Sequence, residues 1–80
     1  MNVIGPRVKQ RREEIGITLD MACARIAGAT DGRWIPEARD LHKIEVQVRI
    51  VSDIELLALA EALECSPLWL LSAATNPNLP

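Results

Sequence analysis

Residues 51–71, VSDIELLALAEALECSPLWLL, contain the two clearest helix starts in the chain. Ser52 and Glu55 have the spacing of a capping box, in which each side chain accepts a hydrogen bond from the other residue's backbone N–H. Val51 can pack on Leu56 and fix the angle at which the chain enters the helix. Apolar residues then recur at helical spacing, at Leu56, Leu59, Ala60 and Leu63. This pattern predicts a helix that begins after Ser52.

A second start follows at Ser66 and Pro67, because a serine cap followed by proline in the first turn favours a helix. The segment LWLLSAA then forms a short last helix. Residues 75–80, TNPNLP, are expected to form a frayed tail, so that the predicted domain covers residues 1–74.

The first half of the chain contains similar signals. One helix is predicted to begin at Gly5-Pro6 and to end before Gly16. Another is capped by Thr18 and continues to the loop AGATDG. No period-two pattern is long enough to build a sheet. The sequence therefore predicts an all-α domain of five short helices.

The remaining helix lies in RWIPEARDLHKIE, residues 33–45, with Pro36 in its first turn, and ends at Glu45 or Val46. With Leu41 pointing inward, the helical period places five residues on the buried side: Glu37, Ala38, Leu41, Ile44 and Glu45. The opposite side carries Pro36, Arg39, Lys43 and Val46, with Asp40 and His42 on the flanks. The outward face is therefore centred on two cations one turn apart, and Asp40 is the acid that opposes them.

Length and composition are typical of one small domain without a membrane span. The chain has 80 residues, of which 49% are hydrophobic, with neither Phe nor Tyr. A core of aliphatic residues suits packed helices. No apolar run approaches the roughly 20 residues that cross a bilayer, and the start MNVIGPRVKQRR lacks the apolar stretch of a secretory signal. We therefore expect a cytoplasmic protein.

Charge is distributed unevenly along the chain. The net charge is −2, but all nine Lys and Arg lie in residues 1–50 against seven acids, a balance of +2. Residues 51–80 contain four acids and no Lys or Arg. This asymmetry predicts a basic face on the first half and a packing or partner surface on the second.

Residues that could form a catalytic or metal site are sparse. Cys23 and Cys65 are not in metal-ligand spacing, and Cys23 is expected in the core. His42 is the only histidine, while Ser52 and Ser66 serve as caps. No nucleophile–base pair or phosphate-binding glycine loop is visible. We expect neither an enzyme nor a bound cofactor, metal or small-molecule substrate.

Three segments carry a family resemblance: RREEIGIT, HKIEVQVR and residues 51–71. Together they resemble the Cro/C1-type (XRE) helix-turn-helix family of phage repressors and bacterial regulators, over about residues 4–72. The resemblance implies a five-helix, lambda-repressor-like domain whose second and third helices form the helix-turn-helix. It also implies an ion pair between Arg12 and Glu45, and both residues fall on the apolar faces of their helices.

The chain departs from the family pattern at three places. Leu19 stands where the family has a glutamine that anchors phosphate, and Ala22 stands where it has a core leucine. The link AGATDGRWIP is longer than in the compact phage repressors. Trp34 within this link is interpreted as a side chain that covers the core.

The resemblance also assigns the DNA contacts. Base contacts carry over to Ala38, Arg39 and Lys43, of which Arg39 is favoured because a guanidinium suits guanine O6 and N7. The predicted phosphate contacts are Arg33, Gln47 and Arg49.

Two functions follow as expectations. The first is sequence-specific binding of double-stranded DNA by a small transcriptional regulator, as a homodimer joined through the LWLL segment. The second is a protein-interaction module of the same fold, such as an antitoxin, adaptor or oligomerisation unit, which binds DNA weakly or not at all. Leu19, Asp40 and the long link motivate the second.

Overall fold

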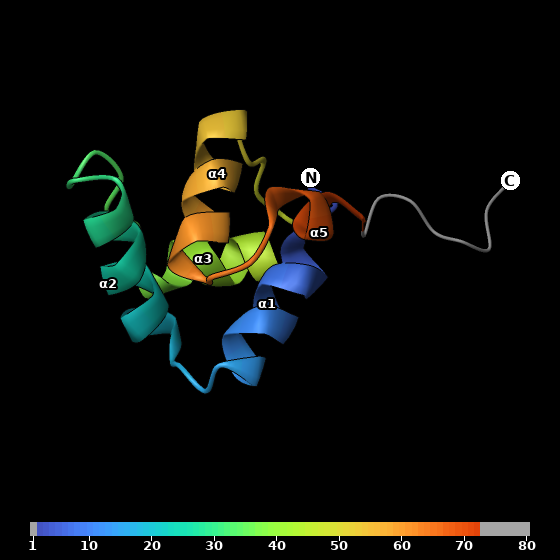
Figure 1. Cartoon of the computed structure of the whole chain (residues 1–80), viewed down its shortest axis with the longest axis horizontal. Helices are drawn as coiled ribbons and strands as arrows, with labels where there is room; N and C mark the ends of the chain where they lie inside the picture. The colour runs from blue at the N-terminus through green and yellow to red at the C-terminus, as the bar shows by residue number, and fades with distance from the viewer. Residues whose placement is uncertain (1, 73–80) are drawn as a thin grey trace, which may run out of the picture.

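The computed structural model describes residues 2–72, which form five helices and no strand (Figure 1). Their bounds are α1 Gly5–Glu14, α2 Leu19–Ala29, α3 Ala38–Glu45, α4 Asp53–Ala62 and α5 Pro67–Leu71. The predicted all-α class is confirmed. The predicted domain end at residue 74 and the tail 75–80 lie outside the described residues.

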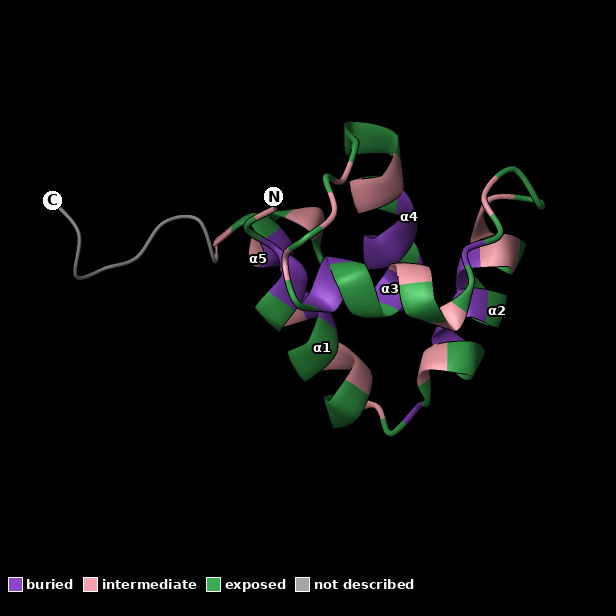
Figure 2. Ribbon diagram, turned by 180° about the vertical axis from the view of Figure 1, so that it is seen from behind, coloured by how far each residue is buried: buried purple, intermediate pink, exposed green. Residues whose placement is uncertain are grey.

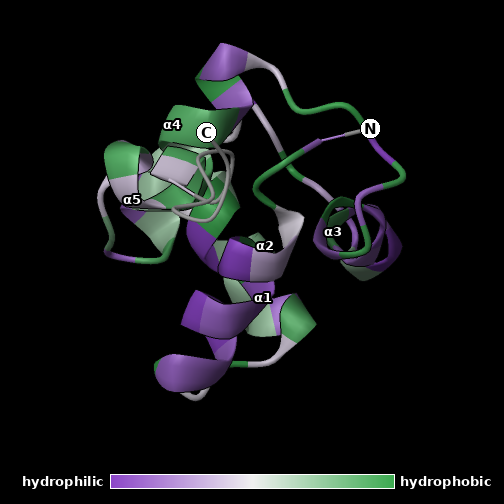
Figure 3. Cartoon of the chain, turned by 90° about the vertical axis from the view of Figure 1, so that its right-hand side faces the viewer, coloured by the Kyte–Doolittle hydropathy of each residue, from purple (hydrophilic) through white to green (hydrophobic). Residues whose placement is uncertain are grey.

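The helices enclose one aliphatic core. α2 packs against α4, and α3 runs across the bundle in contact with both α1 and α2 (Figure 2). The largest fully buried side chains come from all five helices or their ends: Val8, Ile26, Leu41, Ile44, Leu59, Leu63 and Leu70. Figure 3 shows α1 as mostly hydrophilic and α4 as mostly hydrophobic. No helix among residues 2–72 is long and apolar enough to span a bilayer.

The predicted N-caps of three helices are confirmed. Thr18 Oγ1 accepts from Met21 N at 3.1 Å, and Ser66 Oγ accepts from Leu68 N at 3.0 Å. Ser52 forms the expected capping box, described with Glu55 below. These hydrogen bonds satisfy backbone N–H groups that have no partner within their helix.

The start of α3 differs from the prediction. The helix begins at Ala38 after the N-cap Glu37, two residues beyond Pro36. Pro36 is buried, whereas the wheel placed it outward, and Glu37 is exposed, whereas the wheel placed it inward. Both errors have one cause, because Pro36 and Glu37 precede the helix and do not follow its period. Asp40 Oδ2 accepts from Glu37 N at 3.0 Å, so this acid caps the helix.

The loop before α3 is closed by Thr30 and Trp34. Thr30 Oγ1 donates to Ile26 O at 3.0 Å and accepts from Trp34 N at 3.1 Å. Trp34 is partly buried against the core, and the Arg49 guanidinium lies 5.5 Å from its ring centroid. Trp34 is thus a covering side chain, as interpreted from the sequence. Cys23 is buried and free, and burial raises the pKa of its thiol.

Arg12 and Glu45 join α1 to α3 through a bidentate ion pair. Arg12 Nε lies 2.7 Å from Glu45 Oε2, and a second guanidinium nitrogen lies 3.1 Å from Oε1. The same guanidinium donates to Ile17 O at 3.0 Å. Only 2% of the Glu45 side chain is exposed. The hydrogen bond to Glu45 raises the pKa of Arg12. The charge of this buried carboxylate is therefore compensated inside the fold.

Arg49 and Glu55 form a second ion pair at the start of α4. Two Arg49 nitrogens lie 3.1 and 2.8 Å from the two Glu55 oxygens. Glu55 Oε1 also accepts from Ser52 N at 3.0 Å, and Ser52 Oγ accepts from Glu55 N at 3.2 Å. The hydrogen bond from Arg49, followed by those from Ser52, lowers the pKa of Glu55 despite its partial burial.

A Glu55→Gln variant should show this pKa shift in its stability. A lowered folded-state pKa stabilises the fold fully above the unfolded value of about 4.3, and the contribution is lost as pH falls through the folded value. We therefore expect the variant to be less stable than the parent at pH 7 and the difference to shrink at about pH 3. Urea denaturation of both proteins at each pH measures it. A difference that stays constant between the two pH values would contradict the assignment.

Candidate nucleic-acid interface

α3 has one buried side and one exposed side. Leu41 and Ile44 are fully buried, and Glu45 is buried in its ion pair with Arg12. The opposite side carries four exposed residues, Arg39, His42, Lys43 and Val46. Figure 2 shows α3 across the near face of the bundle, with exposed segments toward the viewer. The helix therefore presents two cations and a histidine to solvent.

Arg39 is the more exposed partner of a weak ion pair. Its Nε lies 3.2 Å from Glu37 Oε2, and 78% and 69% of the two side chains are exposed. Ion pairs this exposed contribute at most about 1 kcal/mol, because water screens them and both side chains lose freedom. The guanidinium can exchange Glu37 for a phosphate or a guanine at little cost.

Lys43 and His42 complete the exposed side of α3. Lys43 forms no ion pair and no side-chain hydrogen bond within residues 2–72. His42, which the wheel placed on a flank, is also exposed. His42 therefore belongs with Arg39 and Lys43 as a polar group available to a ligand. Ala38, the remaining predicted base contact, is half-buried in the first turn of the helix.

The acidic side chains of α3 form contacts within the protein. Glu45 compensates Arg12 inside the protein, and Asp40 accepts the backbone N–H of Glu37. An anion in the first turn is also favoured by the helix dipole. The Asp40 carboxylate is thus engaged at the N-terminal end of α3 by the backbone N–H of Glu37.

The C-terminal end of α3 is fixed by the N-terminal segment of the chain. Asn2 Nδ2 donates to Ile44 O at 3.0 Å and to Arg49 O at 2.8 Å. Gly5 N donates to Asn2 Oδ1 at 2.8 Å, and Gln47 Nε2 donates to Asn2 O at 3.1 Å. No local pattern marks Asn2 as a contact of α3, because its partners Ile44 and Arg49 are more than 40 residues away. This clamp holds the exposed side of α3 in place.

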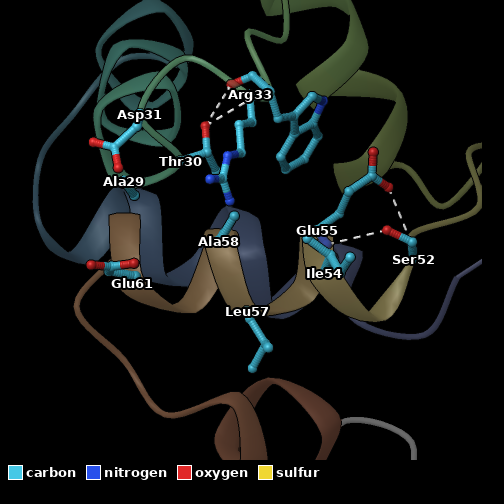
Figure 4. A pocket seen from close by; sticks show the side chains of 11 residues that line it. Ala29, Thr30, Asp31, Arg33, Ser52, Ile54, Glu55, Leu57, Ala58 and Glu61 are labelled. Atoms are coloured by element: carbon cyan, nitrogen blue, oxygen red, sulfur yellow. Dashed lines mark hydrogen bonds between the residues drawn. The ribbon is translucent and has the colours of Figure 1, made fainter.

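The predicted phosphate contacts are not gathered beside α3. The Arg49 guanidinium binds Glu55, and the Gln47 amide binds Asn2, so both side chains already have structural partners. Arg33 is exposed, but it lines a groove next to α4 and reaches toward Ala58 (Figure 4). Of the predicted polar contacts, the structure places only Arg39 and Lys43 on the exposed side of α3.

The basic half of the chain is mostly used to close the fold. Five of the nine cations bind a partner on another element or loop: Arg7, Arg11, Arg12, Arg25 and Arg49. Arg39 is in the exposed pair with Glu37. Arg11 and Arg25 donate to Leu63 O and Ala62 O, at the C-terminal end of α4, where a cation also suits the dipole. Lys9, Arg33 and Lys43 have no ion pair among residues 2–72. The sequence predicted a basic face on the first half of the chain, but only a few cations of residues 2–72 are without a partner.

Lys9 is a further cation close to α3. It is exposed on α1 and lines a shallow groove with Glu45 and Val46, at the C-terminal end of α3. Glu13 and Glu14 line the same groove, so its charge is mixed. Only the packing of α1 against α3 reveals this position, and no local pattern marks it.

Comparison with known proteins found no matching family model, no matching curated protein and no matching solved structure.

Proposed function

We propose that the chain binds double-stranded DNA as a homodimer, with α2 and α3 acting as a helix-turn-helix and α3 lying in the major groove. One observation carries this proposal: the exposed side of α3 combines Arg39, His42 and Lys43, while Asp40 and Glu45 are engaged elsewhere. The resemblance of three segments to Cro/C1-type regulators supports the same function. The protein then acts as a small transcriptional regulator.

Each polar residue of this surface has a chemical role in the proposal. The Arg39 guanidinium donates two parallel hydrogen bonds to O6 and N7 of a guanine. Lys43, one turn later, binds a second base edge or a phosphate. Lys9, at the end of α3, is suited to a flanking phosphate. One module of this size offers a small contact area, and two copies would double the number of bases read.

A specific observation favours a second function, a protein-interaction module of the same fold. The loop after α3 exposes Val48 and Ile50, at 68% and 74%, beside the exposed Val46. Aliphatic side chains make poor phosphate contacts and good protein contacts. Together with the internal use of most cations, this surface supports an adaptor or antitoxin role if DNA binding is absent.

Selection of bound duplexes from a random pool separates the two functions. A DNA-binding homodimer should enrich a two-fold symmetric site whose half-sites are about one helical turn apart. No enrichment from the pool, with a folded protein confirmed by circular dichroism, would remove the DNA proposal and leave the interaction module.

The Arg39→Ala variant tests the assignment of one base contact. Loss of a bidentate contact should cost about 1–3 kcal/mol and relax the selected sequence at one position of each half-site. Arg25→Ala is the matched control, since it removes the same charge from a residue bound to the end of α4. Its selected sequence should equal that of the parent. An unchanged selection for Arg39→Ala would show that Arg39 reads no base.

A further inference from the structure

α4 carries two exposed apolar residues on its outer side, in addition to the exposed acids Asp53 and Glu61. Leu59 is fully buried and Ala62 is 5% exposed, which accounts for the inner side. On the outer side, Ile54 and Leu57 lie one turn apart and are 73% and 58% exposed. A helix at the surface of a monomer normally turns charged residues outward, and apolar residues on both sides are typical of a helix covered on both sides.

A groove lies beside this outer side of α4. It has a volume of about 470 Å³ and is enclosed by α4 and residues 29–34, the end of α2 and the loop that follows. Figure 4 shows Arg33 reaching from the loop toward Ala58, with Ile54 and Glu61 toward opposite ends of the same stretch of α4. Leu57 projects from α4 on the side away from the loop. The small Ala58 side chain leaves this part of the groove hollow next to a projecting leucine.

Three charged residues that line the groove, Asp31, Arg33 and Glu61, have no ion pair among residues 2–72. Arg33 and Glu61 also form no side-chain hydrogen bond within this part of the chain. At the other end of the groove, Glu55 is fully engaged with Arg49 and Ser52. A ligand for this surface must therefore supply an apolar projection, an acid for Arg33 and a cation for Glu61.

We propose that the occupant is a second copy of this chain, related by a two-fold axis beside Ala58. Leu57 of each copy enters the hollow over Ala58 of the other, and Ile54 packs beside it. Glu61 of each copy pairs with Arg33 of the other. In a two-fold interface the same surface of both copies is in contact. One surface must therefore contain both a projection and the hollow that receives it, and both a charge and its opposite. The outer side of α4 and its groove contain the projection (Leu57), the hollow (over Ala58) and both charges (Arg33 and Glu61).

This arrangement also has the composition of a stable interface. Ile54 and Leu57 supply its aliphatic part, and the charged groups of Arg33 and Glu61 select the orientation of the partner. The inference names the contact surface of the proposed homodimer and rests on that part of the proposed function, without requiring DNA. The sequence predicted a dimer surface on α5, from the LWLL segment. Of this segment Leu70 is fully buried, whereas Leu68 and Leu71 are 78% and 41% exposed. This α5 surface is the competing surface.

Sedimentation velocity without DNA tests the interface, at chain concentrations from about 1 μM to about 1 mM. The parent protein should change from monomer to dimer within this range. Leu57→Glu should weaken association by about 30-fold or more, the loss expected for a central interface residue. Leu68→Glu, in which a more exposed leucine is replaced in the same way, should associate like the parent. Thermal melts check that both variants remain folded, since neither side chain is in the core.

A charge exchange tests the orientation of the two copies. Arg33→Glu alone and Glu61→Arg alone should each weaken association by about tenfold, because like charges then face each other. The double variant, Arg33→Glu with Glu61→Arg, should regain most of the loss. Single variants that associate like the parent, or a double variant without recovery, would overturn the proposed pairing.

The outcomes also separate this inference from the proposed function. Dissociation by Leu68→Glu but not by Leu57→Glu would place the dimer contact on α5 and overturn the α4 interface, while a DNA-binding dimer would stand. A parent protein that stays monomeric up to about 1 mM would overturn the α4 interface and the homodimer together. DNA binding would then be judged by the selection alone.

Discussion

Glu45→Ala should lower the free energy of unfolding by about 3–5 kcal/mol, the cost of leaving one member of a buried ion pair without its partner. The Arg12 guanidinium would keep only Ile17 O as an acceptor, with 13% of its side chain exposed. A domain of this size has a total stability of about 4–12 kcal/mol, so the variant should be close to unfolding. Urea denaturation followed by circular dichroism measures the loss.

Glu64→Ala is the matched control for this prediction. Glu64 also pairs with an arginine, but its Oε2 lies 3.4 Å from Arg25 and 69% of its side chain is exposed. Its removal should cost about 1 kcal/mol or less. If Glu45→Ala were as mild as Glu64→Ala, the ion pair between α1 and α3 would not be what holds α3 in place.

Gly5→Ala should be destabilising by about 2–3 kcal/mol, although alanine is the better helix former by about 1 kcal/mol. A Cβ at residue 5 would lie against the carbonyl oxygens of Ile44 and Glu45, the latter at 2.8 Å. Both neighbours are backbone atoms of α3 and cannot rotate away, so α1 and α3 must separate. Thermal and urea unfolding of the variant measure the effect.

Gly28→Ala provides the comparison within the same chain. Gly28 lies near the end of α2, and no atom lies within 4 Å of a Cβ built there. The gain in helix propensity should therefore appear unopposed, as a stabilisation of about 0.5–1 kcal/mol. Opposite signs at these two glycines are expected. A stabilised Gly5→Ala variant would show that α1 and α3 approach less closely than described.

Helix ends were predictable wherever one side chain caps its own helix. Thr18, Ser52 and Ser66 are short hydroxyl residues, and their hydrogen bonds reach at most three residues along the chain. The start of α3 was not predictable in this way, because Glu37 is an uncommon N-cap and Pro36 resembles a first-turn residue. Because the helix begins two residues after Pro36, Pro36 and Glu37 do not lie on the sides that the helical period predicted.

The candidate site was predictable in part. Arg39 and Lys43 follow the helical period, so their exposure came from the pattern around Leu41. Arg49 binds Glu55, and Gln47 binds Asn2. Gln47 and Asn2 are far apart in the sequence, and only the fold brings them together. Charge counts along the chain could not show this, because a count does not say which cations face solvent.

Salt-dependent binding to duplex DNA tests most directly whether the exposed side of α3 binds nucleic acid. The parent protein should bind at about 50 mM salt, and log affinity should fall linearly with log salt, by about 0.9 for each phosphate contacted. Lys43→Ala should make that slope shallower, by about 1 if Lys43 holds a phosphate. No detectable binding at about 50 mM salt, or an affinity that does not change as salt rises, would contradict DNA binding by this protein.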